Sequence, residues 1–144
     1  MTAETLATAN VKQAVPFFRV ADMETSLRFY LEGLGFELTN HWMPNGKIEW
    51  CLLQLGGAAL MLQEFPRDGH DSWVAQGKVG EGVTIYFICE DALAIYRDIT
   101  VRGIAASRPF VGNGMWVVGL NDPDGYRLEF ESNTDAEEDS EYAD

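Results

Sequence analysis

Two carboxylates at alternate positions near the C-terminal end, Glu129 and Glu131, are the residues best placed to do chemistry. They follow an Asp-Pro-Asp-Gly turn at residues 122–125, and polar and apolar side chains alternate through residues 126–132. That period of two predicts a strand with one apolar face and one charged face. Glu129 projects from the middle of the charged face, where it could be a metal ligand, an acid or a solvated surface charge.

The elements that must position this strand repeat one pattern of strand, helix and three strands. Each helix follows an aspartate suited to an N-cap, Asp22 or Asp91, and has apolar side chains at i, i+3, i+4 and i+7. Residues 18–22 align with residues 87–91, so the pattern occurs twice. The predicted strands are residues 14–20, 36–43, 47–55 and 58–65 in the first copy, and 83–89, 105–111, 115–120 and 126–132 in the second.

The segments outside the two copies have no apolar periodicity. Residues 1–12 and the acidic tail, residues 133–144, are predicted to be disordered, because nothing in them can form a core. Residues 13–132 form a single domain, with module one at 13–65, a linker at 66–82 and module two at 83–132. Trp73 is unusual in such a linker and is a candidate for docking on a neighbouring surface.

The composition excludes several classes of function. The net charge of −13 argues against a nucleic-acid partner, which needs a basic surface. No stretch approaches the roughly 20 apolar residues of a membrane span, so no membrane partner is expected. Cys51 and Cys89 lie in apolar runs and fit no metal-binding spacing, which favours a reduced, cytoplasmic protein.

Three motifs resemble the vicinal-oxygen-chelate superfamily, which includes glyoxalase I, extradiol dioxygenases and bleomycin-resistance proteins. They are Val-Ala-Asp at residues 20–22, Ser-Leu-Arg-Phe-Tyr at 26–30 with Gly-Leu-Gly-Phe at 33–36, and the Asp-Pro-Asp-Gly turn followed by Glu129. The resemblance implies an α+β fold of two βαβββ modules that form a curved mixed sheet around a cleft, with the helices outside. It also implies a homodimer.

In the metal enzymes of that superfamily, a His in the first strand and a carboxylate in the last strand of each module hold the metal. The matching positions here are Val15, Met61, Thr84 and Glu129, and Gln63 stands two residues beyond Met61. Only Glu129 matches, and one carboxylate cannot hold a divalent metal against water. We therefore expect no metal and no cofactor, which places the chain closest to the metal-free bleomycin-resistance-like members.

The side chains that line the cleft follow from strand parity. If Phe18 and Val20 face a helix, Phe17 and Arg19 face the cleft, while strand tryptophans can grip planar ligands or belong to a core or interface. His41 and His70 match no ligand position of the superfamily. The predicted ligand-binding residues are Phe17, Arg19, Trp42, Trp50, Tyr86, Trp116, Arg127, Glu129 and Glu131, and no catalytic residue is assigned.

Three functions remain open at this point. The first is a metal-free protein that binds a small cationic or aromatic molecule, with antibiotic sequestration as one form of such binding. The second is a metal-dependent lyase, isomerase, dioxygenase or thiol transferase that uses Glu129 with Gln63 or His41. The third is an interaction module whose aromatic residues form an interface. The sequence favours the first and leaves catalysis undecided.

Overall fold

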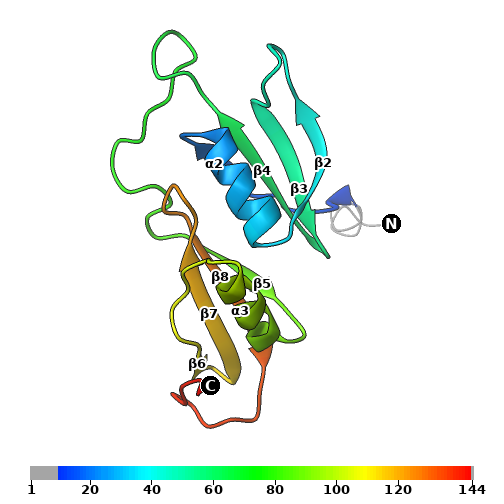
Figure 1. The fold of residues 1–144 in the computed structure, drawn as a ribbon, viewed down its shortest axis with the longest axis vertical. Helices are drawn as coiled ribbons and strands as arrows, with labels where there is room; N and C mark the ends of the chain where they lie inside the picture. Colours follow the sequence, from blue (N-terminus) through cyan, green and yellow to red (C-terminus); the bar gives the residue numbers. More distant parts are fainter. Residues whose placement is uncertain (1–9, 144) are drawn as a thin grey trace.

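The computed structural model describes residues 10–143, which form two modules of one kind (Figure 1). Module one contains β1 (Phe17–Val20), α2 (Met23–Leu27), η1 (Arg28–Gly33), β2 (Glu37–Trp42), β3 (Trp50–Leu55) and β4 (Ala58–Glu64). Module two contains β5 (Thr84–Ile88), α3 (Ala92–Val101), β6 (Phe110–Gly112), β7 (Met115–Asn121) and β8 (Arg127–Asn133). The predicted repeat is confirmed, whereas the disorder predicted for residues 1–12 falls mostly on residues 1–9, which lie outside the described range.

Each module is built on a four-stranded mixed sheet. The strand orders are β1-β4-β3-β2 and β5-β8-β7-β6, and in each sheet the first two strands in that order are parallel while the others are antiparallel. Figure 1 shows α2 lying across the sheet of module one and α3 across that of module two. The fold is therefore α+β with one helix layer on each sheet, as the sequence predicts.

Strand parity separates a helix face from a bare face in each sheet. In β1, Phe18 and Val20 are buried toward the helix, whereas Phe17 is 45% exposed on the other face. In β5, Phe87 is buried and Tyr86 is 58% exposed. Burial of the apolar face supplies most of the stability of such a layer, so the bare faces carry little of the folding energy.

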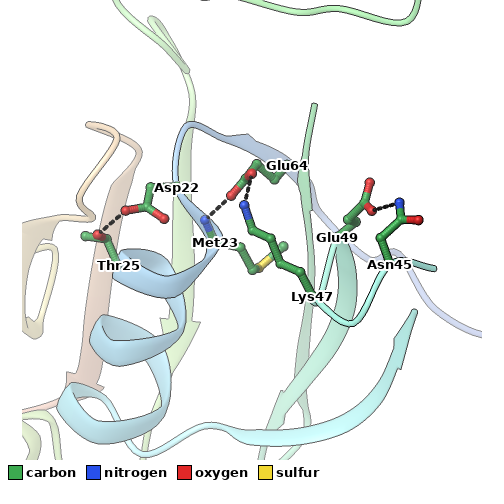
Figure 2. Close-up of polar contacts among 7 residues, drawn as sticks. All are labelled: Asp22, Met23, Thr25, Asn45, Lys47, Glu49 and Glu64. Carbon is green, nitrogen blue, oxygen red and sulfur yellow. Dashed lines mark hydrogen bonds and ion pairs between the residues drawn. The ribbon is translucent and has the colours of Figure 1, made fainter. Parts of the chain in front are cut away.

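Asp22 stands at the N-cap position of the first helix, as predicted, but another residue accepts the backbone N–H at the start of the helix. The Asp22 carboxylate accepts a hydrogen bond from the Thr25 hydroxyl at 2.8 Å and none from the helix backbone. Instead Glu64, at the end of β4, accepts the Met23 N–H at 2.6 Å and pairs with Lys47 (Figure 2). A residue of the sheet thus caps the helix that covers it.

The second helix is capped locally. Asp91 accepts the Ala94 N–H at 3.1 Å, which is the arrangement that its sequence position predicts. The first helix differs in a second way, since after α2 it widens into the π-helical turn η1. Tyr30 and Leu34 are nonetheless buried, so the predicted apolar stripe is correct.

The Asp-Pro-Asp-Gly turn joins the two modules. One oxygen of the buried Asp122 accepts the backbone N–H groups of residues 124, 125 and 126 at 2.8–3.0 Å, and the other accepts the Tyr30 hydroxyl at 2.8 Å. Asp124 accepts the Ala21 N–H at 2.9 Å, and the Tyr126 ring stacks on Phe18 at 4.1 Å. The motif is therefore a structural link between the modules.

The acidic tail is ordered over its described part, contrary to our expectation. Its backbone pairs with β6 through bonds from Asp139 N–H to Val111 O and from Val111 N–H to Ser140 O, at 2.8 and 2.9 Å. The Tyr142 ring meets Tyr96 of α3 edge-on at 5.4 Å. The prediction failed because the acidic composition hides a short segment whose backbone completes a sheet edge.

The predicted strand 105–111 is also shorter in the structure, where β6 begins at Phe110. Pro109 has no N–H to give to a ladder, so pairing starts after it. The other predicted strands overlap the observed ones within a few residues.

Candidate functional site

The bare face of module one is aromatic. The strand registers pair Phe17 with Met61, Arg19 with Gln63 and Trp42 with Trp50, and residues paired in this way share a face. Trp42 is 53% exposed and Trp50 is partly exposed. Four of the predicted residues, Phe17, Arg19, Trp42 and Trp50, therefore lie together on a surface suited to planar or apolar ligands.

The linker contributes one more aromatic ring to this region. The Arg19 guanidinium lies 4.8 Å from the centroid of the Phe65 ring and 5.8 Å from that of Trp73. Both distances are within the range of cation–π attraction. Trp73, singled out in the sequence as a docking residue, thus packs beside a predicted binding residue.

The bare face of module two is acidic. The register pairs Tyr86 with Glu129 and Ile88 with Glu131 between β5 and β8, so these four side chains share a face. The Arg127 Nε lies 3.3 Å from Glu129 Oε2, with side chains that are 38% and 17% exposed. Four more of the predicted residues, Tyr86, Arg127, Glu129 and Glu131, are therefore neighbours.

Gly119 makes room for this arrangement and was missed in the sequence. It lies opposite Glu129 in the β7–β8 register, and a Cβ at this position would collide with the Arg127 guanidinium. Glycine inside a strand is the signal that could have revealed it, since such a residue marks a close approach of another group.

Two groups on the acidic face have raised pKa values. Burial, followed by the neighbouring Glu129 carboxylate, raises the pKa of Glu131. The negative charges of Glu129 and then Glu131 raise the pKa of the Tyr86 phenol. A surface with these negative charges favours the binding of a positively charged ligand.

Trp116 lies away from the other predicted residues. It pairs with Ser132 across β7 and β8, and Ser132 accepts the Ala92 N–H of α3, so this face is the helix face. Trp116 packs against the core there. Trp116 was predicted from its ring type alone, and the β7–β8 register assigns it to the face opposite the one that carries Gly119 and Glu129.

The histidines and cysteines add no second site. His41 is exposed and pairs with Cys51, on the face opposite Trp42, and His70 is exposed in the linker. Burial raises the pKa of the Cys51 thiol to about 11, so it stays protonated as a core residue near neutral pH.

A cleft of about 900 Å³ runs along the outer edge of β5. It lies between β5, α3, the turn at Gly56 and Gly57, and the chain before β1, and its walls include Ile85 and Phe87. Of the nine predicted residues only Tyr86 lines it. The cleft therefore lies beside the acidic face and exposes the unpaired edge of the β5 strand.

Comparison with known proteins identifies the family. The family model of the Glyoxalase/Bleomycin resistance protein/Dioxygenase superfamily matches residues 10–130. The chain belongs to this superfamily.

Relatives of the chain are named for different functions. A Haemophilus influenzae protein named lactoylglutathione lyase is 29% identical over 80% of this chain and 87% of its own length. A Vibrio parahaemolyticus protein named probable lactoylglutathione lyase is 30% identical over 82% of this chain and 88% of its own. The crystal structure of a bleomycin-binding protein complexed with bleomycin has a TM-score of 0.65 at 23% identity, covering 85% of this chain and 99% of that one.

The residues at the superfamily's metal-ligand positions do not fit a metal centre. Val15 and Met61 offer no oxygen or nitrogen donor, and Thr84 is an exposed hydroxyl at the start of β5. Glu129 is the one strong donor of the four, and it is engaged by Arg127. No group of three or more His, Cys, Asp or Glu residues in the described part of the chain is arranged to hold a metal.

Proposed function

We propose that this superfamily member captures a small cationic or aromatic molecule on its bare sheet faces without a metal. Two observations together support this proposal. Aromatic and acidic side chains are grouped on the bare faces, while three of the four metal-ligand positions lack a strong donor. Stacking on Trp42 and Trp50 and attraction to Glu129 and Glu131 would then supply the affinity. The fold shared with a bleomycin-binding protein supports this proposal.

We also propose that the chain acts as a homodimer. Both β1 and β5 are edge strands of their sheets, and the cleft along β5 is lined by apolar side chains such as Ile85 and the exposed Ile88. Unpaired edges with apolar surroundings are covered in most native proteins. A second copy that lays its own module one against β5 would cover the edge and bring an aromatic face close to an acidic one.

Sequestration of an antibiotic would make such a protein a resistance factor, and a cytoplasmic location would suit this role. Cys51 and Cys89 are both free thiols, which fits a reducing compartment. None of the helices in residues 10–143 is long and apolar enough to cross a bilayer.

Native mass spectrometry of the protein from its own source tests the proposal directly. We expect a dimer that carries a small organic molecule. A bleomycin titration followed by tryptophan fluorescence should then reveal saturable binding that weakens when Trp42 is changed to Ala. A dimer with no captured molecule, together with no response to bleomycin or to aromatic cations, would refute capture.

The second candidate is metal-dependent catalysis, favoured by the two relatives named lactoylglutathione lyase and by the match of Glu129 to a ligand position. The assay is turnover of lactoylglutathione after Zn²⁺, Mn²⁺, Ni²⁺ and Fe²⁺ have each been offered. If the protein retains about one equivalent of metal and turns over this substrate in a Glu129-dependent way, the enzyme is correct. Less than about a tenth of an equivalent, with no turnover, favours capture.

A further inference from the structure

Glu131 has a buried carboxyl group, one oxygen of which has no hydrogen-bond partner in the described part of the chain. The residue is 5% exposed, and its Oε2 finds no hydrogen-bond partner among the described residues. Leaving a buried carboxylate oxygen unpaired costs free energy, and native proteins pair such groups in the great majority of cases. The position thus requires an explanation.

The neighbours of Glu131 do not supply a positive charge. On the adjoining strands it lies opposite Ile88 and Val117, and the titratable groups beside it are Glu129 on its own strand, Tyr86 of β5 and Cys89 just after β5. Arg127 is directed at Glu129 and lies over Gly119. Of these two neighbouring carboxylates, Glu129 is the one that pairs with Arg127.

Exposed apolar side chains surround the buried Glu131 carboxyl on this face. Ile88 is 70% exposed and Tyr86 58%, both on the same face, and Phe110 pairs with Val117 beside them and is 41% exposed. An apolar floor around one unpaired carboxylate oxygen is the usual composition of a site for an organic cation. A metal ion would need several more oxygen or nitrogen donors than this face provides.

We propose that Glu131 Oε2 is the anchor for a protonated nitrogen of an organic ligand, an ammonium, amidinium or guanidinium, whose apolar body lies on Tyr86, Ile88 and Phe110. The inference rests on the proposed capture function and names the group that recognises the charge. The ligand nitrogen donates a hydrogen bond to Oε2, so the buried charge is paired only in the complex. No bond is made or broken.

A matched pair of probes tests the anchor. The ¹⁵N-labelled full chain is titrated in about 0.15 M salt with 2-phenylethylamine and, separately, with the neutral 2-phenylethanol. We expect the amine to bind at least about tenfold more tightly than the alcohol, which corresponds to one charge-assisted hydrogen bond. Amide shifts should concentrate at Val117, Gly119 and Glu131.

Two variants separate the anchor from the general acidity of the protein. Glu131→Gln should reduce the preference for the amine to less than about twofold while binding of the alcohol is unchanged. Glu32→Gln removes one exposed negative charge from η1 of module one and should retain the full preference. Thermal unfolding of both variants checks that each is folded.

Several results would overturn the anchor. They are equal binding of amine and alcohol, a preference that survives Glu131→Gln, shifts that map away from β7 and β8, or no binding of either probe at 20 mM. If Glu131→Gln does not fold, the wild-type preference and the map of shifts decide alone. Capture itself is judged by the trapped molecule and the bleomycin titration, so the anchor can fail while capture stands.

Discussion

The two modules share one arrangement of strands and helix, and they differ in the side chains on the sheet face that the helix does not cover. Each has a parallel pair of strands, two antiparallel additions and one covering helix. Module one presents aromatic rings such as Trp42 and Trp50, whereas module two presents Glu129 and Glu131 with an arginine. A repeated fold therefore does not imply a repeated site, because the helix face determines the fold and the bare face is free to diverge.

The modules also differ in what holds their edges and caps. In module one a sheet residue, Glu64, caps the helix, and in module two the cap is the adjacent Asp91. Module two is extended at β6 by the C-terminal segment. Variants that remove these contacts measure how far each half depends on them.

The largest effect is expected at the link between the modules. Asp122→Ala would leave the buried Tyr30 hydroxyl and the backbone N–H groups of residues 124 and 126 without their acceptor, and should lower the free energy of unfolding by about 3 kcal/mol. Urea unfolding measures this. An effect below about 1 kcal/mol would show that the modules are joined elsewhere.

Asp122→Asn provides the matched control and a pH dependence. Burial raises the pKa of Asp122 above its ordinary 3.8, so the contribution of this group to stability is full below about 3.8 and declines as the pH rises through the folded-state pKa. The Asn variant has no such decline. Stability curves that stay parallel for the two proteins would contradict this assignment.

Removal of residues 134–144 should destabilise module two by roughly 2 kcal/mol, because it removes the backbone bonds to β6 and the contact of Tyr142 with Tyr96. Hydrogen exchange should report the loss at Val111 and leave module one unchanged. An unchanged melting temperature would restore the view that the acidic tail is disordered.

The two caps form a direct comparison between the modules. Glu64→Ala should cost about 1.5 kcal/mol, because it removes both the cap on α2 and the pair with Lys47, and Asp91→Ala about 1 kcal/mol. Urea unfolding of the single variants and of the double variant gives both values. If Asp91→Ala lowers the free energy of unfolding clearly more than Glu64→Ala does, the contact of Glu64 with the first helix contributes little to stability.

The smallest effect concerns the acidic face. Glu129→Gln removes the principal negative charge beside Tyr86, so the pKa of the phenol should fall toward its ordinary value of 10.0. Ultraviolet titration of the phenolate, with Tyr86→Phe to assign the signal, measures this shift. A pKa that stays raised in the variant would place the cause in another group.

The strands, the helices and the faces they bury were predictable because the periodicity of apolar residues indicates them. Alternation in β1, β5 and β8 assigned faces correctly, and the N-cap positions followed from aspartates that precede apolar stripes. The cap by Glu64 was not predictable, because it joins residues 41 apart in the sequence.

The faces of the candidate residues were predictable where strand parity was applied. Eight of the nine predicted residues divide between two bare faces, whereas Trp116 was predicted from its ring type without a face assignment for β7, and its register with Ser132 places it on the helix face. The ordered tail escaped prediction for a different reason: its contacts come from backbone groups, which every residue carries and no pattern of side chains marks.

The Asp122 turn has a consequence for how this protein can change over generations. Because the turn fastens the halves through Tyr30 and Ala21, away from the bare faces, replacing a residue such as Trp42 or Ile88 removes little that folding needs. Mutational tolerance and molecular recognition therefore reside on the same surface, and new ligands can be acquired there with little loss of stability.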